Sequence, residues 1–203
     1  MDTNSEAIER ELYFYNYFVT RFENDPNLNV EAVACAMATA AHESQSFRKL
    51  KELSYTLERA KKVWPARFVL DAKKRAILQR YGSDGIFEIA YGGRMGNNAF
   101  GDGMKYIGRG IIMTTGKDGY KFVEEKTGYP VVANPSLLEK DFQLACEAFC
   151  VYWEDRVKMS DAARGDIQKV TLAVNGGLNG LPDRLRHYDF YFRKYIPQLK
   201  RGE

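Results

Sequence analysis

The hydrophobic pattern of the chain has mostly helical spacing. In residues 6–22, apolar side chains recur at steps of three and four, which predicts an amphipathic helix. In residues 30–42, apolar side chains fill almost every position, which predicts a buried helix with Asn29 as its N-cap. Further helices are predicted at residues 57–63, 71–81, 120–126, 141–155 and 166–174, with a last one beginning near Pro182.

Residues 82–119 lack this pattern and contain eleven glycines. Loops of this length are usually functional or disordered, and the aromatic and branched residues here argue for order. We predict a glycine-rich wall with short strands around Tyr106 and at Ile111 and Ile112. The fold predicted for residues 1–203 is a single, mainly α, lysozyme-like domain with two helical lobes and a cleft lined by this wall.

Two glutamates near the end of the buried helix are candidates for chemistry. Glu43 falls in the last turn, and Ser44 to Ser46 weaken the helical pattern, so we expect the helix to stop there. In a continuous helix, Glu52 would lie roughly 13 Å from Glu43 on the opposite face. A break lets Glu52 approach Glu43 across a cleft, at the roughly 6.5–9.5 Å that inverting glycosidases require.

The expected surroundings of Glu43 suit a general acid. Burial and the negative end of the helix dipole both favour a protonated carboxyl group. On spacing alone, however, two solvated surface charges are the commoner explanation of such a pair.

The composition narrows the classes of function. The chain is 45% hydrophobic and 28% charged, which indicates a globular protein rather than a disordered one. Its net charge of +3 comes from scattered lysines and arginines, which suits an anionic polymer and argues against nucleic acid. No membrane span is visible, so we expect no stable membrane insertion. No secretory signal is visible either, so we expect the protein to be made in the cytoplasm.

The cysteines do not indicate a metal site. Cys146 and Cys150 lie four residues apart on an apolar helical stretch, which predicts buried free thiols. The chain has only two histidines and no Cys/His cluster, so no metal and no cofactor are expected.

Four segments in order carry a family resemblance. They are residues 41–68 (beginning AHESQSF), 91–97 (YGGRMGN), 101–120 (GDGMKYIGRGIIMTTGKDGY) and 174–184 (VNGGLNGLPDR). Together they resemble the glycoside hydrolase family 19 chitinases, and most closely the compact bacteriophage endolysins of that family. The resemblance implies that Glu43 is the general acid, that Glu52 is the base activating water, and that Thr115 helps to hold that water.

The sequence departs from the family pattern near the base. One residue is missing before Leu53, and an alignment made from Tyr55 would place Lys51 at the acidic position. We favour Glu52 as the base and keep Glu58 as the alternative, although Glu58 is also explained as a helix-surface charge paired with Lys62.

The resemblance also implies substrate contacts. Asn175 in the NGG turn would contact the sugar, and Arg184 would steady the catalytic carboxylates. Arg109 is a candidate for substrate contact, although a structural ion pair explains it as well. Met113 replaces a family glutamine that binds sugar, which puts one contact in doubt. Candidates to stack on sugar faces are Tyr55, Tyr91 and Tyr106, for each of which core packing is an equal explanation.

The first functional hypothesis is therefore an endolysin that hydrolyses the β-1,4 glycan of bacterial peptidoglycan with inversion. Such an enzyme would be a monomer that waits in the host cytoplasm until a holin releases it to the cell wall. The alternatives are a chitinase, a lytic transglycosylase and a catalytically silent glycan-binding module.

Overall fold

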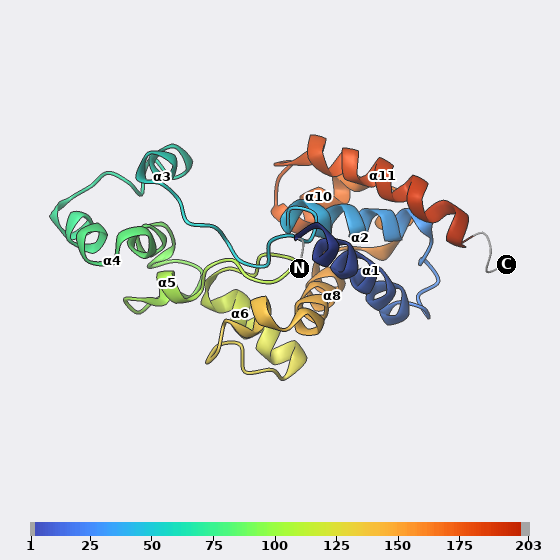
Figure 1. Cartoon of the computed structure of the whole chain (residues 1–203), viewed down its shortest axis with the longest axis horizontal. Helices are drawn as coiled ribbons and strands as arrows, with labels where there is room; N and C mark the ends of the chain where they lie inside the picture. The colour runs from blue at the N-terminus through green and yellow to red at the C-terminus, as the bar shows by residue number, and fades with distance from the viewer. Residues whose placement is uncertain (1–2, 200–203) are drawn as a thin grey trace. The chain divides into compact units, whose positions relative to one another are not determined.

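The computed structural model describes residues 3–199 and confirms the mainly helical fold (Figure 1). The helices are α1 (Thr3–Arg21), α2 (Val30–Glu43), α3 (Leu57–Val63), α4 (Ala72–Tyr91), α5 (Asp102–Lys105), α6 (Gly116–Thr127), α7 (Leu137–Lys140), α8 (Phe142–Arg156), α9 (Met159–Ala162), α10 (Ile167–Asn175) and α11 (Leu181–Leu199). None of these described helices is long and apolar enough to cross a membrane.

The predicted strands are absent from the described residues. Pairing of β type is limited there to two isolated bridges, from Arg109 to Lys51 and from Arg109 to Thr114. Ile111 and Ile112 lie in the turn between the bridged residues, so the strand predicted for them is wrong. Tyr106 lies just after α5 and outside any bridge, so the strand predicted around it is wrong as well.

The chain divides into two compact units. The first comprises residues 1–50, 110–112 and 141–203, and the second comprises residues 51–109 and 113–140. The first therefore contains α1, α2 and α8 to α11, and the second contains α3 to α7.

The core of the first unit is built around α2. Residues 32–41 of this helix are all buried, as the uninterrupted apolar pattern predicts, and Asn29 caps it by accepting a hydrogen bond from the Ala32 amide. Aromatic residues from α1, α8 and α11 cover α2, and α11 runs beside it in Figure 1. Cys35, Cys146 and Cys150 are buried and free, which confirms the expected free thiols at Cys146 and Cys150.

The turn after α2 fixes where this helix ends. The helix stops at Glu43, as predicted, and Gln45, Ser46 and Phe47 then adopt left-handed φ angles of 52°, 56° and 62°. This conformation costs roughly 1–2 kcal/mol for each non-glycine residue. Phe47 is fully buried and its ring lies 5.6 Å from that of Phe14, while Ser44 Oγ accepts a hydrogen bond from the Phe47 amide. Packing and hydrogen bonds thus hold a strained turn directly after Glu43.

In the second unit, the principal difference from the prediction lies in α4. The sequence predicts a helix that Gly82 closes, and Gly82 is indeed non-helical (φ 55°, ψ −127°), a backbone conformation that other residues rarely adopt. The sequence analysis missed a second helical segment, which runs from this kink to Tyr91. The segment after the kink is helical because Ile86, Ile89 and Ala90 pack into a core with Ala60 and Phe68.

Candidate active site

Glu43 lies at the end of α2 in the first unit, against Arg184 of α11. The Arg184 side chain is fully buried, and its Nη2 donates a hydrogen bond to Glu43 Oε1. The same Nη2 lies 3.5 Å from Asn175 Oδ1, and Asn175 Nδ2 donates to the Asn179 carbonyl at 3.2 Å. Since the Glu43 side chain is one-fifth exposed, the carboxylate keeps contact with solvent. Three of the predicted site residues are thus together in this unit.

A second link between the same two helices lies beside the first. His42 Nδ1 is 2.7 Å from Asp183 Oδ2, and Arg186 Nη2 donates to Asp183 Oδ1 at 2.8 Å. These hydrogen bonds, chiefly the one from His42, lower the pKa of Asp183 to about 2. Burial lowers the pKa of His187, which lies 3.5 Å from the same carboxylate. Consecutive residues of α2 therefore pair with consecutive residues of α11.

We expect the Asp183 link to stabilise the fold in a pH-dependent way. Because its pKa lies below the usual 3.8, Asp183 contributes stability above about pH 4 and loses that contribution as the pH falls towards 2. Asp183→Asn should therefore lower the thermal unfolding midpoint at pH 7, and its deficit relative to wild type should shrink between pH 4 and pH 2. Asp189→Asn, at an exposed position of α11, is the control. A deficit that stays constant down to pH 2 would contradict this assignment.

Glu52 lies in the second unit and is held by two donors. Glu52 Oε1 accepts a hydrogen bond of 2.6 Å from the Tyr91 hydroxyl, and Oε2 accepts one of 3.1 Å from the Gly108 amide. The Glu52 amide in turn donates to the Gly108 carbonyl at 2.8 Å. Both carboxylate oxygens therefore have a partner, which fixes the plane of the carboxylate.

Gly108 brings Glu52 and Thr115 together. A Cβ atom placed on Gly108 would lie 3.2 Å from Thr115 Oγ1 and 3.4 Å from Glu52 Oε2. The Thr115 hydroxyl donates to the Met113 carbonyl at 2.7 Å, and Met113 has a left-handed φ of 52°. Glu52 and Thr115, which the sequence analysis pairs around a water, thus line the same glycine.

Two of the candidate substrate contacts have partners within the fold. Arg109 is buried, and it donates from Nε to Glu139 at 3.1 Å and from Nη1 to Tyr120 at 3.0 Å. Tyr106 is only 2% exposed, its hydroxyl donates to the Val132 carbonyl, and its ring packs against Tyr120. The burial of Tyr106 fits core packing and the contacts of Arg109 fit a structural ion pair, the alternatives that the sequence analysis left open.

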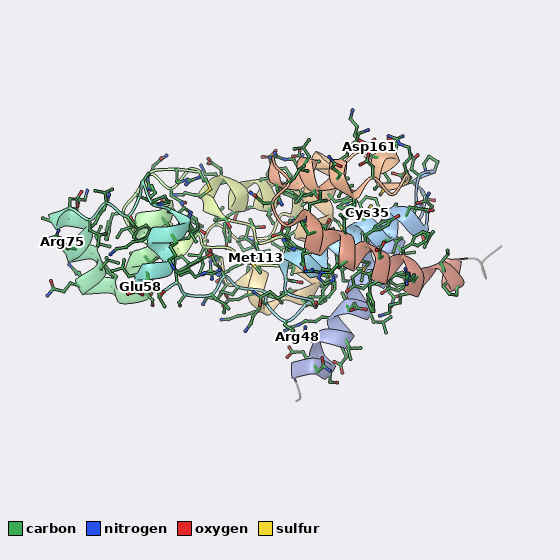
Figure 2. The ribbon with its side chains drawn as sticks, turned by 90° about the horizontal axis from the view of Figure 1, so that it is seen from above. Cys35, Arg48, Glu58, Arg75, Met113 and Asp161 are labelled. Atoms are coloured by element: carbon green, nitrogen blue, oxygen red, sulfur yellow. The ribbon has the colours of Figure 1, made fainter. Side chains whose placement is uncertain are left out.

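The alternatives to Glu52 have different surroundings. Glu58 is exposed in the first turn of α3 (Figure 2). Lys51 is exposed and lies 3.9 Å from Glu139, and its cationic side chain cannot act as a base. Glu52 is the acidic side chain of this segment that a glycine and a hydroxyl approach closely.

An aromatic cluster lies beside Glu52. The Trp64 ring lies 4.9 Å from that of Tyr55 and 5.6 Å from that of Tyr91, and Phe87 packs against both tyrosines. Burial is the largest cause of the raised pKa of both Tyr55 and Tyr91, and the charge of Glu52 adds to it. Tyr55 is thus near Glu52, as the sequence analysis expects for a site residue.

Three contacts at this site were not predicted from the sequence. They are the Tyr91 bond to Glu52, the Glu139 bond to Arg109 and the Asp183 link to His42. Each joins residues at least 30 positions apart, so no local periodicity could indicate it. The only available signal was that Tyr91 and Asp183 fall within the motif segments.

The arrangement supplies two carboxylates in different surroundings. Glu43 has a cationic partner in the first unit, whereas Glu52 has neutral donors in the second. Two such carboxylates are what glycoside hydrolysis requires, one to donate a proton and one to accept it. The separation of the two carboxylates across a cleft stays a prediction.

Comparisons with known proteins agree with this chemistry. No protein-family profile matches the chain. A curated protein of Haemophilus influenzae, named as a glycosyl hydrolase family 19 domain-containing protein, is 31% identical over 180 residues. That match covers 86% of this chain and 85% of the relative.

Solved structures share the fold. Chitinase C from Streptomyces griseus is similar with a TM-score of 0.55 at 17% identity, covering 96% of this chain and 69% of the chitinase. A bacterial family 19 chitinase is similar with a TM-score of 0.57 at 16% identity, covering 89% of this chain and 84% of the other.

Proposed function

We propose that this chain, which belongs to glycosyl hydrolase family 19 and is a glycoside hydrolase, is an endolysin that degrades peptidoglycan. Its substrate would be the β-1,4-linked glycan of the bacterial cell wall, which it would hydrolyse with inversion. The mild positive charge and the similarity of the motif segments to phage endolysins support this choice over other glycans.

The proposed reaction uses three side chains. Glu43 donates a proton to the glycosidic oxygen as the bond to the anomeric carbon breaks. Glu52 accepts a proton from a water molecule on the opposite face of the sugar, and Thr115 helps to orient that water. The water oxygen bonds to the anomeric carbon, so the product has the inverted configuration and no covalent intermediate forms.

The observation that best supports this mechanism is the placement of Glu52 and Thr115 around Gly108. Because Gly108 has no side chain, a carboxylate and a hydroxyl both approach it closely, and these are the two groups needed to hold a nucleophilic water. The hydrogen bonds from Tyr91 and Gly108 hold the Glu52 carboxylate in place beside Thr115.

A chitinase is the second candidate. The solved structures with this fold include chitinases, and Met113 stands where the family pattern has a sugar-binding glutamine. An activity towards polymers of N-acetylglucosamine would use the same carboxylates, so the two candidates differ in the sugars bound on either side of the scissile bond.

Product analysis separates these functions. Purified peptidoglycan and chitin oligomers are each digested with the wild-type protein, and the new chain ends are identified by mass spectrometry. Reducing muramic acid ends are expected, whereas reducing glucosamine ends would show that the other glycosidic bond is cleaved. Anhydro ends would indicate a lytic transglycosylase. Cleavage of chitin alone would indicate a chitinase, and inactivity on both substrates would indicate a glycan-binding module.

The proposed role includes a place of action and a state of assembly. As an endolysin, the protein would be a monomer held in the host cytoplasm until a holin opens the inner membrane. Expression with and without a holin tests this proposal, since lysis should require both proteins. Lysis by the protein alone would contradict it.

A further inference from the structure

Tyr91 is the side chain that most directly restrains Glu52. Its hydroxyl donates to Glu52 Oε1 at 2.6 Å, across 39 residues of sequence. On the other oxygen, Gly108 provides a backbone donor. With one donor on each oxygen, the carboxylate cannot rotate about its last bond without losing a hydrogen bond.

The position of Tyr91 is itself fixed by the fold. It is the last residue of α4, and its ring packs edge-on against Trp64 at 5.6 Å and parallel to Phe87 at 6.1 Å. Its carbonyl accepts a hydrogen bond of 3.0 Å from Asn97 Nδ2. The ring and the backbone are therefore anchored independently of Glu52, which makes the hydroxyl a preorganised donor.

The hydroxyl stays a donor at any pH at which the enzyme would act. Burial, followed by the charge of Glu52, raises the pKa of Tyr91, so the phenol is neutral throughout the acidic and neutral range.

We propose that Tyr91 is a positioning residue that fixes the Glu52 carboxylate beside Gly108 and Thr115. This inference rests on the proposed function of Glu52 as the base. Without this donor the carboxylate can rotate about its last bond, so fewer of its conformations place an oxygen beside Gly108 and Thr115.

The variant Tyr91→Phe tests this role because phenylalanine keeps the ring that packs against Trp64 and Phe87. In the full-length protein, kcat should fall about tenfold with KM little changed. This split between kcat and KM separates a loss of positioning from a loss of substrate binding. Tyr129→Phe, at an exposed position of the same unit, is the matched control and should leave kcat and KM unchanged.

Two further variants keep the result interpretable. Glu52→Gln should abolish activity, and activity that survives this change would overturn the base role itself and with it the inference. If Tyr91→Phe does not fold, fluorotyrosine at position 91 replaces it, because it keeps the ring packing and alters the strength of the donated hydrogen bond, so kcat should change while KM stays the same. With Glu52→Gln inactive, a kcat that neither substitution at Tyr91 changes would overturn the inference, and the expected change in kcat at constant KM would support it.

Discussion

Glu43→Gln should lower the kcat for glycan cleavage by about 10²–10⁴-fold, because glutamine cannot donate the proton that the leaving oxygen needs. The fold should persist, since the amide oxygen can still accept the hydrogen bond from buried Arg184. Turbidity loss of a peptidoglycan suspension measures the rate, and thermal unfolding reports the fold.

The matched control for this variant is Glu31→Gln, which makes the same change in the first turn of the same helix. Its rate should equal that of the wild type. If Glu43→Gln retained more than about a tenth of the wild-type rate while remaining folded, Glu43 could not be the general acid.

Arg184→Met should destabilise the fold by about 1–3 kcal/mol, because it leaves the partly buried Glu43 carboxylate without its charged partner. Adding Glu43→Gln should recover most of this loss, since a neutral amide does not need a cation. The reason is that two nitrogens of the Arg184 side chain, Nε and Nη1, are buried and have no hydrogen-bond partner among the described residues. Much of the benefit of this arginine therefore comes from Nη2, which donates to Glu43 and lies 3.5 Å from Asn175 Oδ1.

A double-mutant cycle in urea measures this coupling from the unfolding free energies of the four proteins. Both variants that carry Arg184→Met should also have low activity, even where stability is recovered. If the two losses of stability were simply additive, Arg184 and Glu43 would not be energetically coupled, and the ion pair would have no part in positioning the acid.

The helices of the first unit could be predicted from the sequence because their determinants are local. The apolar run of α2, its Asn29 cap and its end at Glu43 all follow from short-range pattern and capping chemistry. The left-handed turn at Gln45, Ser46 and Phe47 could not be predicted, because none of these residue types favours such angles. Burial of Phe47 imposes the turn through contacts made elsewhere in the chain.

The second unit was harder to predict because glycines in it serve several purposes. Gly82 separates two helical segments at a kink, whereas Gly108 admits a carboxylate and a hydroxyl to one point, and a count of glycines does not separate the two roles. Similarly, a buried Arg109 and an exposed substrate-binding arginine look the same in sequence. The bond of Arg109 to Glu139, 30 residues away, appears only in the folded chain.

The configuration of the first product tests the central claim most directly. A soluble β-1,4-linked oligomer that the protein cleaves is followed by proton NMR from the moment of mixing, before the new reducing end equilibrates. Water activated by Glu52 on the face opposite to the leaving group predicts that the α-anomer appears first. A β-anomer formed first, or an anhydro sugar, would contradict the mechanism that assigns Glu43, Glu52 and Thr115 their roles.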